Sequence, residues 1–105
     1  MPNYCAEDGE DCMCGGYVIY GQKLNKDKKA NDFKDIINSS FAIEKVKEGL
    51  NALACSVDGF GGTDPFPDGE KACFCDNKMK MFDESSVKDI QLYWESEGTI
   101  ISGSL

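Results

Sequence analysis

Short runs of apolar and β-branched residues, separated by segments rich in Gly, Lys or Asp, dominate most of the chain. Such runs, bounded by turn residues, are typical of β-strands. The clearest covers residues 11–20 and ends in Tyr-Val-Ile-Tyr, with Gly15-Gly16 marking a bulge or a close backbone approach and Gly21 ending the strand. The same pattern predicts strands over residues 41–46, 52–57 and 71–76, and residues 80–82 can extend the sheet.

Helical signals are confined to two segments. Residues 22–38 are rich in Lys, Asn and Asp and predict a loop, with one weak helix around residues 31–37 as the alternative. Further on, Ser86 and Asp89 have the spacing of a capping box, and apolar residues then recur on one helical face. We therefore expect a short amphipathic helix near residues 86–97.

These elements predict one cysteine-rich domain over residues 1–105. Its fold class is mainly β, a small sandwich or barrel-like antiparallel sheet, with one C-terminal helix near residues 86–97. Residues 83–105 form a helix-plus-tail extension, and the apolar tail can add a strand or dock on a partner. A 105-residue chain buries only a modest core, so covalent or metal staples would help. With no apolar run long enough to span a bilayer, we expect no membrane insertion.

The charged residues argue against several classes of partner and against catalysis. The net charge is −8, and all 11 basic residues are Lys, with no Arg and no His. An acidic balance argues against nucleic acid and anionic membrane surfaces as partners. Without His, the chain lacks the usual base that activates a Ser or Cys nucleophile near neutral pH. We therefore expect a protein that is not an enzyme.

Two Cys-x-Cys segments, Cys12-Met13-Cys14 and Cys73-Phe74-Cys75, carry most of the remaining information. Residues i and i+2 of a strand point to the same face. If each segment lies on a strand and the strands are neighbours, four sulfurs meet on one face. Such a cluster forms either disulfides or a tetrahedral metal site.

Disulfides are the favoured interpretation. If Cys12 and Cys14 face Cys73 and Cys75 across an antiparallel pair, their Cβ atoms lie about 5 Å apart, and small adjustments close a bridge. Six cysteines allow 15 pairings. Bridges consistent with the spacing are Cys14–Cys75, which closes a loop of about 60 residues, and equally Cys5–Cys12 and Cys55–Cys73.

Zinc is the alternative cofactor, held by an all-cysteine site; free buried thiols are a third possibility. Structural zinc sites usually take ligand pairs two to four residues apart around a tight turn, which Cys-x-Cys on extended strands matches less well. Disulfides imply an extracellular or secretory compartment. The opening Met-Pro-Asn shows no secretory signal, so the alternatives are a cytoplasmic protein or a mature form with an added initiator Met.

Several blocks resemble a known module. They are CAEDGEDC at residues 5–12, VIYG at 18–21, AC at 54–55, FGGTDP at 60–65 and GEKAC at 69–73. Together they resemble the small cysteine-rich module CAxEGxxC…VxYG…AC…FGDP…GxxKxC, attached to fungal and protist secreted proteins and to some glycoside hydrolases such as α-galactosidases. The chain departs from this pattern where FGDP is interrupted.

The resemblance implies a compact, β-rich, disulfide-bonded accessory module that binds a glycan. It places the four cysteines of the module at Cys5, Cys12, Cys55 and Cys73. Cys14 and Cys75 then form an added pair, each two residues after a cysteine of the module, as an extra cross-strand disulfide would require.

The expected ligand surface is the Gly- and Pro-rich loop 58–69, through Asp58, Phe60, Asp64 and Phe66. Phe66, between two prolines, is the expected exposed contact, whereas core packing is the default for Phe60. The aspartates of this loop do not have the spacing of a twelve-residue calcium loop, so turn formation is their expected role.

The expected function is therefore a non-enzymatic, disulfide-stapled accessory or binding module with a carbohydrate or protein partner. One alternative is a small structural subunit of a large assembly that docks through the C-terminal helix and tail. The other is an intracellular zinc-binding protein.

Overall fold

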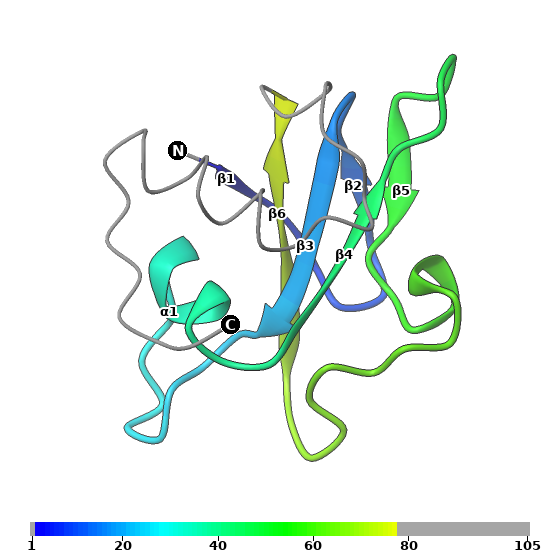
Figure 1. Ribbon diagram of the computed structural model, residues 1–105. Coiled ribbons are helices and arrows are strands. Elements are labelled where there is room, and N and C mark those ends of the chain that lie inside the picture. Colours follow the sequence, from blue (N-terminus) through cyan, green and yellow to red (C-terminus); the bar gives the residue numbers. More distant parts are fainter. Residues whose placement is uncertain (1, 78–105) are drawn as a thin grey trace.

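The computed structural model describes residues 2–77, which form two antiparallel β-sheets and one short α-helix (Figure 1). The larger sheet has the order β1 (Asn3–Glu7), β6 (Lys71–Asp76), β3 (Tyr17–Gln22), β4 (Phe41–Lys45). The smaller sheet pairs β2 (Asp11–Met13) with β5 (Ala52–Ala54), and the other elements are α1 (Phe33–Ile37) and a 3-10 turn, η1 (Asp58–Phe60). The mainly β prediction is confirmed; the predicted helix 86–97, strand 80–82 and tail 99–105 lie outside the described residues.

The central strands β3 and β6 are buried on both faces, and this organises the core. Val18 and Tyr20 of β3 enter a cluster that residues of both sheets build, whereas Tyr17 and Ile19 enter a second cluster with α1. Side chains of β6 divide between the two clusters in the same alternating way. A strand buried on both faces needs apolar residues at successive positions, which explains the unbroken Tyr-Val-Ile-Tyr run.

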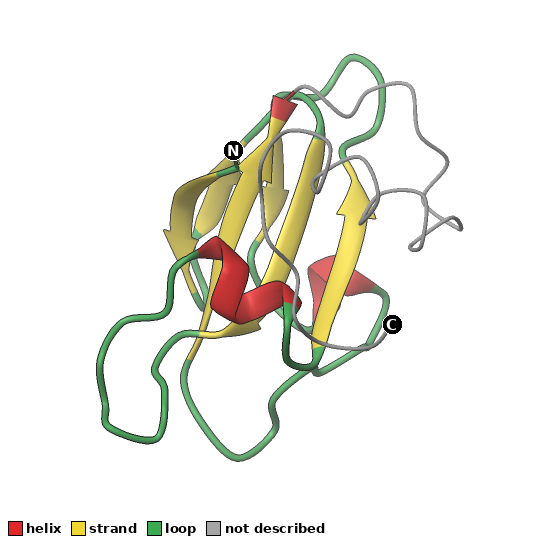
Figure 2. Cartoon of the chain, turned by 60° about the vertical axis from the view of Figure 1, so that its left-hand side comes forward, coloured by secondary structure: helices red, strands yellow, loops and turns green. Residues whose placement is uncertain are grey.

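Helix α1 covers the face of the larger sheet that the smaller sheet leaves open (Figure 2). It begins with a capping box, in which Asp32 accepts the Asp35 backbone N–H and Asp35 accepts that of Asp32. Phe33, Ile36 and Ile37 are buried beneath it. The weak helix expected around residues 31–37 is therefore present, one turn long. Within residues 2–77 no helix has the length and apolarity to cross a membrane.

The strand predicted over residues 11–20 is wrong as a single element, because β2 and β3 belong to different sheets. The chain changes sheet at Gly15-Gly16, where a Cβ on Gly16 would lie 2.2 Å from the Asp76 carbonyl oxygen. The glycines thus permit the predicted close approach. Strand β3 also continues through Gly21, and the strand predicted over 52–57 ends at Ala54.

The six cysteines form three disulfides, and each one joins the larger sheet to the smaller sheet or to the residue that follows one of its strands. The bridges are Cys5–Cys12, Cys14–Cys75 and Cys55–Cys73. The prediction of a disulfide-rich chain is confirmed. The predicted geometry is wrong, however: the two Cys-x-Cys segments do not oppose each other across paired strands, because β2 pairs with β5 and β6 pairs with β1 and β3.

We expect the three bridges to contribute unequally to stability. Cys14–Cys75 joins residues 61 apart and Cys5–Cys12 residues 7 apart. In the chain-entropy model, replacing both partners with Ala costs about 4 kcal/mol for the long loop and about 2.5 kcal/mol for the short one. Urea denaturation of the two double variants measures the difference. Equal losses would contradict loop closure as the main contribution.

Candidate functional site

Lys71 anchors the predicted ligand loop, residues 58–69. Its ammonium group is buried, lies 3.2 Å from Asp64 Oδ1 and 3.7 Å from Asp8 Oδ2, and donates to the carbonyl oxygens of Phe66 and Gly69. Two carboxylates and two carbonyls thus surround one cation. Asp64 Oδ1 also accepts the Phe66 backbone N–H, at 3.1 Å. The loop therefore uses its own oxygen atoms to hold its shape.

Phe60 lies inside the core, only 3% exposed, and its ring stacks on Tyr20 with centroids 4.9 Å apart. The Tyr20 hydroxyl donates to Asp8 Oδ1 at 2.6 Å, so Asp8 connects this aromatic pair to Lys71. Burial and the hydrogen bond to Asp8 raise the pKa of Tyr20. Phe60 cannot stack on a ligand without leaving this cluster.

Asp58 and Phe66 remain accessible on the loop. Asp58 is exposed at the start of η1, and Phe66 is partly exposed. The Phe66 ring lies against the backbone of Gly69, where a Cβ would come within 2.3 Å of the ring. The structure thus keeps Phe66 at the surface and holds Phe60 and Asp64 in internal contacts; a ligand role for the loop stays a prediction.

Replacing Lys71 with Met is expected to destabilise the protein by about 2 kcal/mol, because Asp64 and two carbonyl groups lose a buried donor while remaining partly exposed to water. Urea denaturation measures the cost, and Lys26→Met, at an exposed lysine, is the matched control. A cost equal to that of the control would show that the cation does not hold the loop.

Glu7 forms a second charged contact at the same end of β1, with the Lys23 ammonium and the Tyr4 hydroxyl. These two hydrogen bonds lower the pKa of Glu7 below its ordinary value. Partial desolvation and the hydrogen bond to Glu7 raise the pKa of Tyr4, which is 53% exposed, to about 12. Because the folded state holds Glu7 ionised, it binds fewer protons there than the unfolded chain does.

The contribution of Glu7 to stability is therefore complete above its unfolded pKa, about 4.3, and is lost as pH falls through the lowered folded value. We expect Glu7→Gln to flatten the fall in unfolding free energy on the acid side of about pH 5. Urea denaturation at a series of pH values measures this, with Asp68→Asn in an exposed turn as control. Identical acid profiles for both variants would contradict it.

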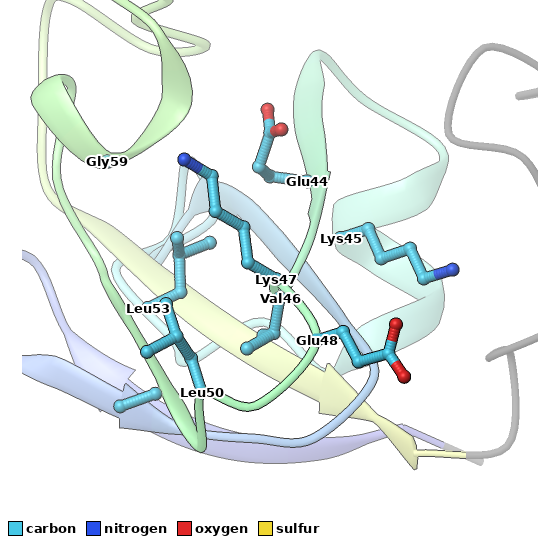
Figure 3. Close-up of a pocket in the computed structure, with 9 residues that line it drawn as sticks. Glu44, Lys45, Val46, Lys47, Glu48, Leu50, Leu53 and Gly59 are labelled. Carbon is cyan, nitrogen blue, oxygen red and sulfur yellow. The ribbon is translucent and has the colours of Figure 1, made fainter.

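A groove of about 530 Å³ opens beside loop 58–69, between the end of β4 and β5 (Figure 3). Its floor is apolar, from Val46, Leu50, Ala52 and Leu53, and Gly59 of η1 closes one end. In Figure 3, Leu50 and Leu53 lie along one side, and Lys45 and Glu48 point away from them. Charged residues of both signs, at 44, 45, 47 and 48, form the rim. Leu50, one of the residues that line the groove, is 55% exposed.

Backbone contacts to the disulfide region support the groove. The Val46 N–H donates to the Gly16 carbonyl oxygen at 2.8 Å, and the Cys14 N–H donates to that of Asn51 at 2.8 Å. Between them residues 47–50 form a turn, in which the Leu50 N–H donates to the Lys47 carbonyl oxygen and Gly49 has φ 87°. Both walls are thus tied to the segment that contains Cys14 and its bridge to Cys75.

The sequence did not indicate this groove. Its residues come from two segments, 44–50 and 52–59, whose proximity depends on how the sheets pack. The only local signal was Leu50, an isolated apolar residue between Gly49 and Asn51.

Within residues 2–77, no group of three or more His, Cys, Asp or Glu side chains is arranged to hold a metal ion. All six sulfurs are in covalent bridges, so an all-cysteine zinc site would require a reduced protein. No family model, curated protein or solved structure matches the chain.

Proposed function

We propose that this protein is a non-enzymatic, disulfide-stapled binding module whose groove between β4 and β5 receives an extended segment of a protein partner. The observation that carries the proposal is the apolar floor, which includes the half-exposed Leu50, on a framework tied by three disulfides. A concave cleft of this size, with an apolar lining and polar groups around it, is the usual form of a binding site.

The chemistry of the groove favours a peptide over a sugar. Its floor has aliphatic side chains that would accept one apolar side chain, and the rim has both cations and anions that suit flanking charged residues. The absence of His and Arg from the sequence supports a role without catalysis. Three disulfides fit an oxidising extracellular or secretory compartment. The alternative of a structural subunit rests on residues 83–105, outside the described part.

A random linear peptide library displayed on phage tests this function when panned against the oxidised protein. Enriched peptides are expected to contain an aliphatic residue flanked by charges and, as synthetic peptides, to shift the backbone amide NMR signals of residues 44–53. Leu50→Asp is expected to lower their affinity about tenfold, because an apolar contact is replaced by a charge.

Met13→Asp is the matched control, since Met13 is 69% exposed and does not line the groove. It is expected to leave the affinity unchanged. Shifts confined to residues 58–69, or equal losses in both variants, would overturn the assignment to the groove.

A further inference from the structure

A second cleft, of about 430 Å³, lies between the loop 23–31 and α1, and polar side chains line it throughout. They contribute four carboxamides, one hydroxyl, one ammonium group and one carboxylate. No apolar or aromatic side chain is among them, in contrast to the groove beside β5. The charges of the lining sum to zero in a protein whose net charge is −8.

Three of the carboxamides are fixed by one of their two polar atoms. Asn31 Nδ2 donates to the Gln22 carbonyl oxygen at 2.9 Å, and Gln22 Nε2 donates to that of Leu24 at 2.6 Å. Asn25 Oδ1 accepts the backbone N–H groups of residues 27 and 29. The other polar atom of each, Asn31 Oδ1, Gln22 Oε1 and Asn25 Nδ2, has no hydrogen-bond partner within residues 2–77. Two hydrogen-bond acceptors and one donor, on side chains whose positions are fixed, are therefore available to a ligand.

The backbone of the loop holds these groups in position. Leu24 and Ala30 form an antiparallel bridge, and the Asn25 N–H donates to the Lys29 carbonyl oxygen at 2.9 Å. Lys28 lies between them at φ 61°, in the left-handed region. Side chains fixed before binding lose less conformational freedom when a ligand arrives.

We propose that this cleft binds a neutral sugar unit of a glycan. Each sugar hydroxyl both donates and accepts, which matches a lining that offers fixed donors and acceptors together. An anionic ligand would meet Asp35, and a cationic one would meet Lys26. An apolar ligand would find no apolar side chain in the lining. This site is separate from loop 58–69 and does not depend on the proposed peptide groove.

The test is a titration of the ¹⁵N-labelled oxidised protein, followed by NMR. The neutral probes are glucose, galactose, mannose and N-acetylglucosamine; the charged comparators are glucuronic acid and glucosamine. At least one neutral sugar is expected to cause saturable shifts within residues 22–39, with a Kd on the order of 1 mM for so small a ligand. The absence of saturable shifts with every neutral sugar, shifts centred elsewhere, or tighter binding of a charged comparator would overturn the proposal.

Two variants with matched controls sharpen the result. Asn31→Leu removes a fixed acceptor and Lys26→Met removes the ammonium group, and each is expected to weaken binding about fivefold. Asn51→Leu and Lys47→Met make the same changes at exposed positions beside the other groove. Asn31 also donates a hydrogen bond to the Gln22 carbonyl oxygen, so Asn31→Leu can disturb the loop. Lys26 is exposed, so Lys26→Met still tests the site in that case. Equal losses in variants and controls would contradict the assignment.

Discussion

The covalent connection between the two sheets is the constraint on which the rest of this structure depends. The smaller sheet has only three residues in each strand, too few for independent stability in water. Each of its strands contains, or is followed by, a cysteine bound to β1 or β6. The interior between the sheets then contains Cys12, Cys55 and Cys73, each fully buried, beside Val18 and Tyr20. The disulfide sulfur atoms therefore link the two sheets and also form part of the hydrophobic core between them.

Both proposed binding sites lie on the outside of this framework. The bridges and the double-sided burial of β3 and β6 stabilise the centre, and the connecting segments add individual side chains to it, such as Val46 and Phe60. Two of them fold back on themselves through local polar contacts: loop 58–69 around the Lys71 ammonium, and loop 23–31 around the Asn25 side chain. Side chains of opposite character therefore line two separate surfaces, one floored by aliphatic groups and the other by carboxamides.

The local sequence pattern was sufficient to predict a strand and its bounds where every residue of the strand is buried. Residues 71–76 match β6 at both ends, because six successive buried positions are bounded by turn residues. The sequence pattern failed where tertiary contacts decide the structure: nothing near Gly16 indicates the close approach of the Asp76 carbonyl at the change of sheet. Strand β1 was missed because it is an edge strand with little buried surface and an acidic sequence around it. Each disulfide joins segments that belong to different sheets. The spacing of the cysteines is consistent with the observed pairing, but it is also consistent with others and could not select among them.

Strand β4 connects the two proposed binding sites, since Asn38 and Ser39 of the polar cleft precede it and Glu44 and Lys45 of the groove end it. A five-residue strand spans roughly 16 Å. A partner that presents a peptide and a sugar at that separation would engage both ends of one rigid element. Its second contact would form at a high effective concentration, so two weak attachments would combine into a selective one. Binding would then depend on the distance between the peptide and the sugar on the partner as well as on their chemistry.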